Sequence, residues 1–92
     1  MSASTYAVSW MTARGAPCAG RLGLDRHGLT LNGASKGSPV TQEIGFDEIE
    51  DVRVDAGRLQ VTRHDGRSLT IGSLDAPGAL WELAERLARA AR

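Results

Sequence analysis

The feature that most constrains the fold is a change of hydrophobic periodicity close to residue 75. From Tyr6 to Ile71, apolar residues alternate with polar ones in short runs, and Gly, Pro, Asp or Asn residues separate the runs. This pattern is typical of β-strands joined by tight turns. From Asp75 onward, apolar residues recur every three or four positions, as on one face of a helix. The sequence therefore predicts a mainly β domain with one C-terminal α-helix.

Seven strands are expected between about residues 6 and 72. The first strand, residues 6–13, carries apolar side chains on both faces and is therefore predicted to be central in the sheet. Residues 32–39 hold two Gly, two Ser and one Pro, which predicts a long and mobile loop. The pair Asp65-Gly66 lies between two alternating runs and is the strongest hairpin signal in the chain.

The fifth strand is predicted to follow a distortion of the sheet. Ile49 is out of phase with Val52 and Val54, although all three are apolar. An extra residue in a strand shifts the alternation in this way. We therefore expect a bend or a bulge around Asp47 and Glu48.

The terminal helix is expected over about residues 75–91. Asp75 or Ser73 can cap its N-terminus, and Pro77 suits the first turn because a missing N–H costs little there. One apolar stripe is expected to cover an open end of the β-roll; it comprises Leu80, Leu83, Ala84, Leu87 and Ala91. Trp81 lies at the border of this stripe, so we expect it to be half buried, either packed on the domain or anchoring a partner.

Composition excludes several classes of function. Eleven Lys and Arg residues balance eleven Asp and Glu residues, so the chain has no surplus of positive charge for generic nucleic-acid binding. Cys18 is the only cysteine, which excludes an intramolecular disulfide and a cysteine-based zinc cage. No segment approaches the roughly 20 apolar residues of a membrane span. We expect a single soluble, cytoplasmic domain over residues 1–92.

No sequence motif indicates catalysis. The chain lacks a Gly-rich phosphate loop, a serine-triad motif and paired catalytic carboxylates, so we expect neither an enzyme nor a bound cofactor. His27 and His64 lie in similar turns and form a metal site only if those two hairpin tips meet; ordinary turn residues are the preferred interpretation. Cys18 has no partner placed by a motif, and we interpret it as an inert thiol rather than a nucleophile.

Acidic residues are concentrated between residues 47 and 55. The group consists of Asp47, Glu48, Glu50, Asp51 and Asp55, and Arg53 interrupts it. Its spacing matches no calcium loop. It is able to attract a basic partner or a divalent cation, but a strand edge protected from aggregation by charge is the preferred interpretation.

Several short segments of the sequence resemble the first residues of strands in the pleckstrin-homology-like superfold, in particular in its bacterial PH-like and GRAM-like domains. They are residues 20–24, 28–31 and 46–49, the last followed by Val52. The resemblance covers nearly the whole chain and includes the order of seven strands followed by one helix. It implies a seven-stranded β-roll or barrel capped by the terminal helix, as a single PH-like domain.

The resemblance also implies two kinds of ligand. Family members that hold phosphoinositides place several Lys and Arg residues on the first two strands and the loop between them, where this chain offers only Arg14 and Arg21. Other members bind peptides or proteins. We therefore expect a protein or peptide partner, including a second copy of the chain, bound through a strand edge or the helix flank near Trp81. The alternative is weak, salt-sensitive attachment to anionic lipid headgroups through Arg14, Arg21 and Lys36.

Overall fold

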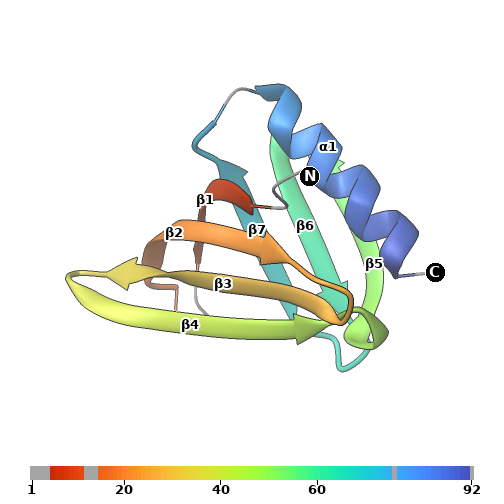
Figure 1. Cartoon of the computed structure of the whole chain (residues 1–92), viewed down its shortest axis with the longest axis horizontal. Helices are drawn as coiled ribbons and strands as arrows, with labels where there is room; N and C mark the ends of the chain where they lie inside the picture. Colours follow the sequence, from red (N-terminus) through yellow and green to blue (C-terminus); the bar gives the residue numbers. More distant parts are fainter. Residues whose placement is uncertain (1–4, 12–14, 76, 92) are drawn as a thin grey trace.

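The computed structural model describes residues 5–11, 15–75 and 77–91 (Figure 1). These residues form seven strands, one short 3-10 helix and one α-helix. The elements are β1 (Thr5–Met11), β2 (Pro17–Leu24), β3 (Gly28–Ser35), β4 (Ser38–Gly45), η1 (Phe46–Glu48), β5 (Ile49–Asp55), β6 (Arg58–Arg63), β7 (Ser68–Ser73) and α1 (Pro77–Ala90). The predicted fold class, mainly β with a C-terminal helix, is confirmed.

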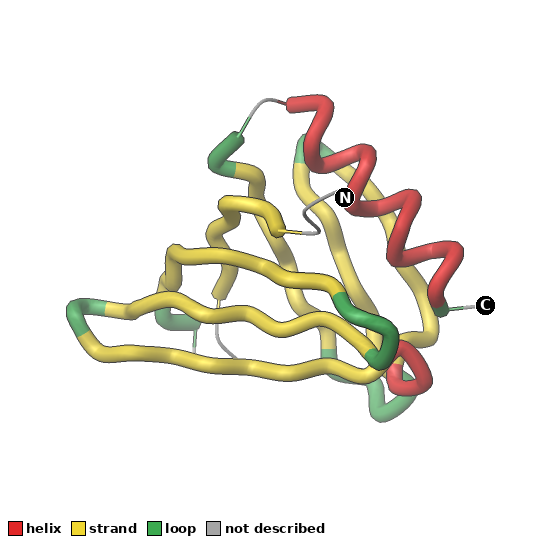
Figure 2. Tube along the Cα trace, viewed as in Figure 1, coloured by secondary structure: helices red, strands yellow, loops and turns green. Residues whose placement is uncertain are grey.

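All seven strands belong to one antiparallel sheet in the order β4-β3-β2-β1-β7-β6-β5. The sheet bends into a roll, so that the β2–β4 part and the β5–β7 part face a common interior (Figure 2). α1 packs mainly against β5, with further contacts to β7 and β6, and covers one side of the roll (Figure 1). Because the sheet does not close, β4 and β5 remain as its two edges.

β1 is the central strand, as its apolar character predicts. Tyr6, Val8 and Trp10 point into the core and are almost completely buried. The opposite face is only partly covered, because the roll has a single interior and its other surface meets solvent. Met11 is 52% exposed at the end of the strand, where it lines an open pocket together with Gln42 of β4 and Leu69 of β7. The described strand ends at Met11, and the predicted continuation through Ala13 lies outside the described residues.

The predicted loop over residues 32–39 is wrong, because β3 and β4 continue through it. Only Lys36 and Gly37 separate the two strands. Both have positive φ angles, 51° and 81°, which is the backbone of the two-residue turns that match the twist of a hairpin. The polar, small residues of this segment therefore belong to a long, regular hairpin rather than to a loop.

Gly33 and Pro39 are residue types that favour loops, but here both lie in strands, each for its own reason. A Cβ on Gly33 would collide with the backbone carbonyl of Ala19 on β2 and would also lie 2.8 Å from Cη2 of Trp10, so this position requires glycine. Pro39 lies in the edge strand β4, where a residue without an N–H is tolerated if that N–H would point away from the neighbouring strand. Neither residue interrupts the pairing of β3 with β4.

The predicted distortion near Asp47 and Glu48 is confirmed. The chain forms the 3-10 helix η1 there, and the pairing of β5 with β6 shifts register between Ile49 and Asp51. The hairpin predicted at Asp65-Gly66 is also confirmed, as a loop of four residues between β6 and β7.

α1 buries the predicted stripe, including Leu80, Leu83 and Leu87. Burying a leucine contributes roughly 1.5 to 3 kcal/mol, more than the exposed i,i+4 ion pairs of the outer face. Trp81 was expected to be half buried, but its side chain is 64% exposed. It lies about 100° around the helix from Leu80, which turns it away from the roll. Among the described residues, no helix has the length and apolar character needed to cross a lipid bilayer.

The segment before α1 is attached to the sheet. Asp75 and Ser73 were predicted as helix caps. In the structure, the Asp75 carboxylate accepts a hydrogen bond from the backbone N–H of Ala7 at 3.1 Å, and the Ser73 hydroxyl accepts one from the N–H of Asp75 at 3.1 Å. These contacts connect the start of the helix to β1 and β7.

Candidate functional site

The outer edge of β4 presents unpaired backbone groups. The two-residue turn at Lys36-Gly37 makes Ser35 and Ser38 a hydrogen-bonded pair. Hydrogen-bonded and non-hydrogen-bonded pairs alternate along an antiparallel ladder, so the peptide groups of Thr41 and Glu43 face away from β3. No described residue bonds to these outward groups. They form, with the carbonyl of Pro39, what we call the β4 edge (Figure 1).

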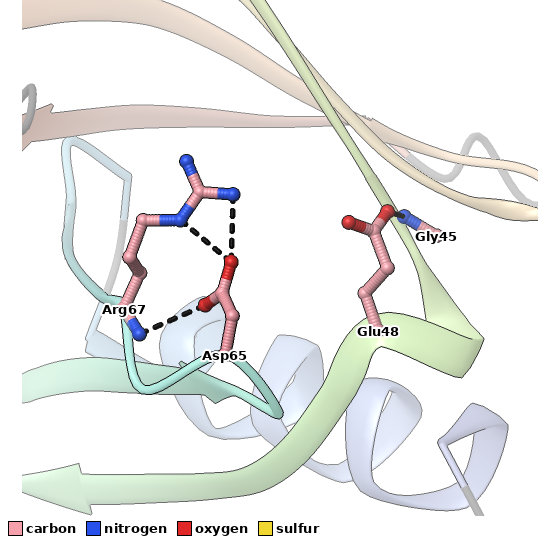
Figure 3. Close-up of polar contacts among 4 residues, drawn as sticks. All are labelled: Gly45, Glu48, Asp65 and Arg67. Atoms are coloured by element: carbon pink, nitrogen blue, oxygen red, sulfur yellow. Dashed lines mark hydrogen bonds and ion pairs between the residues drawn. The ribbon is translucent and has the colours of Figure 1, made fainter.

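The β4 edge is short because both of its ends are closed. Pro39 has no N–H to offer. At the other end, the N–H of Gly45 donates to Oε2 of Glu48 at 2.8 Å (Figure 3). Glu43 is the only charged residue in the strand, and its side chain lies on the outer face.

The edge formed by β5 differs in its side chains and its surroundings. Its exposed positions carry the charges of Glu50, Asp51, Arg53 and Asp55. Nε of Arg53 donates to Oδ2 of Asp51 at 2.8 Å. The start of β5 also lies beside Ala88 and Ala91 near the C-terminal end of α1. This arrangement agrees with the interpretation that the acidic residues protect a strand edge.

A buried arginine lies in the roll interior close to β4. The inward row of β6 consists of Leu59, Val61 and Arg63, and Arg63 is only 9% exposed. Its guanidinium makes no hydrogen bond or ion pair with any residue that the structure describes. Its nitrogens are not fully shielded from solvent, because Trp10 Nε1 is the one buried side-chain nitrogen or oxygen without a partner in the described structure. Arg63 therefore presents a largely enclosed positive charge to which an anionic or strongly accepting ligand atom can bind.

Arg63 lines an open pocket of about 250 Å³ between β4 and the β6–β7 hairpin. We call it the Arg63 pocket; its other lining residues are Met11, Gln42, Arg67, Ser68 and Leu69. Gln42 shares the inward row of β4 with the buried Ile44. The pocket thus combines a guanidinium, an amide and a hydroxyl with the apolar side chains of Met11 and Leu69.

The second arginine of this pocket already has a partner. Nε and Nη2 of Arg67 each lie 2.7 Å from Oδ2 of Asp65, and the N–H of Arg67 donates to Oδ1 at 2.9 Å (Figure 3). The backbone hydrogen bond first, and then the guanidinium, lower the pKa of Asp65. Arg63 acts on the same carboxylate through space and also lowers its pKa. Asp65 therefore serves two arginines, which leaves these three side chains with one net positive charge.

The two histidine turns meet at η1 through backbone contacts. The N–H of Phe46 donates to the carbonyl of His27 at 2.9 Å, and the N–H of His64 donates to the carbonyl of Glu48 at 3.0 Å. Within the described ranges, no three His, Cys, Asp or Glu side chains are grouped so that they could hold a metal ion. The two hairpin tips therefore converge, as the metal hypothesis required, but they do so as structural turns.

The first of these turns is held by an aspartate. Oδ1 of Asp25 accepts hydrogen bonds from the N–H of His27 at 2.7 Å and of Gly28 at 3.0 Å. These two bonds lower the pKa of Asp25. His27 is exposed beside this turn, in the position of an ordinary turn residue.

Cys18 lies on the inward face of β2 and is only 4% exposed. Its thiol lies 3.7 Å from the carbonyl of Ala16, and it is a free cysteine. A side chain at this position fills the core, which agrees with the interpretation of Cys18 as an inert thiol.

The residues predicted to bind a partner lie on separate elements. Trp81 is on the outer side of α1, Arg21 is on the outer face of β2, and Lys36 is at the tip of the β3–β4 hairpin. Arg21 pairs with Asn32, four residues before Lys36, which corresponds to a separation on the order of 13 Å along the sheet. Arg14 lies outside the described residues.

Arg63 and Gln42 were not recognised from the sequence. A signal for Arg63 was present, because alternation places it on the same strand face as the core residues Leu59 and Val61. At the end of a strand, however, an arginine at a core-facing position usually extends its charged end into solvent. Its burial depends on β4 crossing the same end of the roll, which no local pattern reveals.

Comparison with known proteins concerns the fold. No protein-family model matches the sequence, and no curated protein does. The crystal structure of the C-terminal domain of an unknown protein from Leishmania infantum aligns with a TM-score of 0.67 at 20% identity, over 91% of this chain and 81% of that one. The complex of the FERM and C-terminal domains of Drosophila Merlin aligns with a TM-score of 0.54 at 14% identity, over 91% of this chain and 28% of that one.

At these identities the two likenesses show the fold alone. The C-terminal lobe of a FERM region is PH-like. This chain shares its element order, seven antiparallel strands followed by one helix. The fold of this protein is therefore pleckstrin-homology-like.

Proposed function

We propose that this protein is a non-catalytic interaction module that binds an extended segment of a protein or peptide partner by strand addition at the β4 edge. The observation that carries the proposal is the outward-facing backbone of Thr41 and Glu43, which no described residue pairs. An added strand gains main-chain hydrogen bonds there without a sequence motif in the receptor.

The contrast between the two edges supports this choice of surface. Natural sheets protect their edges with charged side chains, with proline or with a covering element. The edge at β5 has four charged exposed residues and α1 beside it, whereas β4 has one charge and one proline at its start. The open groups of β4 are therefore the best place in the described structure for a partner strand.

Attachment to anionic lipids was the alternative expectation, and it has weaker support. Arg21 and Lys36 lie on different elements, so these two cations do not form a single patch for headgroups. The relation to bacterial PH-like domains and a cytoplasmic location remain expectations. A second copy of the chain is the other occupant that the β4 edge would accept.

The proposal is tested with binders selected from a display library of random twelve-residue peptides. A selected peptide is titrated into the ¹⁵N-labelled protein, and amide shifts are recorded. We expect the largest shifts at Thr41, Gln42 and Glu43. Largest shifts on β5 and α1 would place the partner elsewhere and contradict the proposal. Dimerisation without peptide binding, measured by sedimentation, would identify the second copy as the occupant.

A proline variant isolates the backbone contribution. Thr41→Pro removes an outward N–H but leaves the pairing with β3 intact, as Pro39 does two residues earlier. We expect at least a tenfold loss of peptide affinity. Thr41→Val is the matched control, because it also loses the hydrogen bond from Oγ1 of Thr41 to Oδ1 of Asn32 but retains the N–H. Equal affinity of both variants would rule out strand addition at β4.

A further inference from the structure

We infer that the Arg63 pocket binds a carboxylate carried by the segment that adds to β4, so that the preferred partner has an Asp or Glu at one inward-facing position. This inference rests on the proposed function and names the chemistry of its partner. The pocket provides the observation that points to a ligand, namely a cationic residue that is only 9% exposed and whose guanidinium makes no hydrogen bond or ion pair with a described residue.

Strand geometry brings a partner side chain to the pocket. A strand added to β4 would lie about 4.8 Å from it, and side chains that are directly opposite each other point to the same face. Gln42 points inward and lines the pocket. The partner residue opposite Gln42 would therefore point inward as well, into the space between β4 and the β6–β7 hairpin where Arg63 lies.

The charges around the pocket favour a single negative charge. Arg67 is compensated by Asp65, whose oxygens accept three interactions from it. The carboxylate of Glu48 accepts from the N–H of Gly45 at the end of β4. Arg63 acts on Asp65 only through space, so Arg63, Arg67 and Asp65 together keep one net positive charge. One carboxylate balances that charge, whereas a phosphate dianion would exceed it.

The donor set also suits a carboxylate. A guanidinium presents a planar fork that matches the two oxygens of a carboxylate, and such charge-assisted pairs are strong when they are shielded from water. The Gln42 amide and the Ser68 hydroxyl supply further donors at the pocket wall. Met11 and Leu69 provide apolar surface for the methylene groups of a Glu or Asp side chain.

The experiment compares two seven-residue peptides that alternate threonine and valine. One carries glutamate at the central inward position and its twin carries glutamine there; amide shifts of the labelled protein and calorimetry report binding. We expect the glutamate peptide to bind at least tenfold more tightly. In Arg63→Gln the two peptides should bind equally, and Arg63→Lys should restore part of the preference. Arg53→Gln, the same change on β5, should leave the preference unaltered, because Arg53 pairs with Asp51.

The outcomes separate this inference from the proposed function. If both peptides shift β4 amides with equal affinity, strand addition stands and the carboxylate inference is overturned. If neither peptide shifts β4 amides at millimolar concentration, the proposed function fails and the inference fails with it. A third peptide carries phosphoserine at the same position. Tighter binding of that peptide than of the glutamate peptide would overturn the choice of a carboxylate, as would a preference that survives in Arg63→Gln.

Discussion

Both edges of the sheet have backbone N–H and C=O groups that face away from the neighbouring strand. The two edges differ in the side chains and elements that protect these groups. At β5, the exposed positions carry Glu50, Asp51, Arg53 and Asp55, and the end of α1 lies alongside. At β4, only Glu43 is charged, and among the described elements no helix lies beside the strand except η1 at its end (Figure 1). Strand edges left without charge or cover are templates for pairing. In the comparison, the β5 edge carries four charges and has a helix alongside, whereas the β4 edge has one charge and no such cover among the described residues.

The inward-facing side chains behind the two edges also differ. The inward row of β5 is apolar, with Val52 and Val54 packed against the core cluster that includes Leu87 of α1. The inward row of β4 includes Gln42, which lines a pocket with the buried cation Arg63. A partner at β5 would contact side chains that already pack against the core. A partner at β4 would contact a pocket with a positive charge that it could neutralise.

The largest effect is expected from loosening the cover of β5. Leu87→Ala removes a completely buried side chain from α1, and we expect the free energy of unfolding to fall by about 2 to 5 kcal/mol. Urea denaturation measures the loss, and hydrogen exchange should show β5 and β6 opening before β3 and β4. Leu74→Ala is the control, because Leu74 is 59% exposed and its loss should change stability little. Uniform opening of both edges would argue against α1 as the specific cover of β5.

A smaller effect of opposite sign is expected behind β4. Arg63→Met keeps the length of the side chain but removes a largely enclosed charge that makes no hydrogen bond or ion pair in the described structure, so we expect the free energy of unfolding to rise by up to about 1 kcal/mol. Arg53→Met makes the same change on β5, where the side chain is 74% exposed, and should alter stability by less than about 0.5 kcal/mol. Destabilisation by Arg63→Met would mean that Arg63 serves the fold rather than a ligand.

The smallest effects are expected at the two turns that join the edge strands to their neighbours. Lys36 and Ala56 have positive φ angles of 51° and 52°, which asparagine adopts more readily than either residue. Lys36→Asn and Ala56→Asn should each raise the free energy of unfolding by a few tenths of a kcal/mol, measured by thermal denaturation. Similar gains would indicate that the edges differ in their side chains and not in their turns; a loss at either site would contradict this equivalence.

Local signals were sufficient where a spacing of a few residues defines the structure. The hairpin at Asp65-Gly66, the distortion before Ile49 and the helix stripe of Leu80, Leu83 and Leu87 follow from alternation, turn chemistry and helical periodicity. The same signals failed at residues 32–39, because Gly33 is required by the backbone of Ala19 on β2 and by the ring of Trp10 on β1. Composition alone cannot separate a glycine needed for packing from one needed for a loop.

The candidate site was predicted less well than the fold. A strand edge was expected as the binding surface, but periodicity does not say which strands are edges, since that depends on the order β4-β3-β2-β1-β7-β6-β5. Trp81 was placed at the border of the apolar stripe, where a small rotation of the helix decides between burial and exposure. The cations Arg21 and Lys36 were grouped by their charge, and the strands separate them.

The sequence by itself determined the number and order of strands, the helix that follows them and the apolar stripe by which that helix packs. These properties depend on neighbours two to four positions apart, so they are present in every short window of the chain. Only the tertiary structure decided that β4 stays open, that α1 lies beside β5 and that Arg63 is buried beside Gln42. Those facts depend on how the open sheet bends into a roll, which brings together residues about twenty positions apart on strands that do not pair.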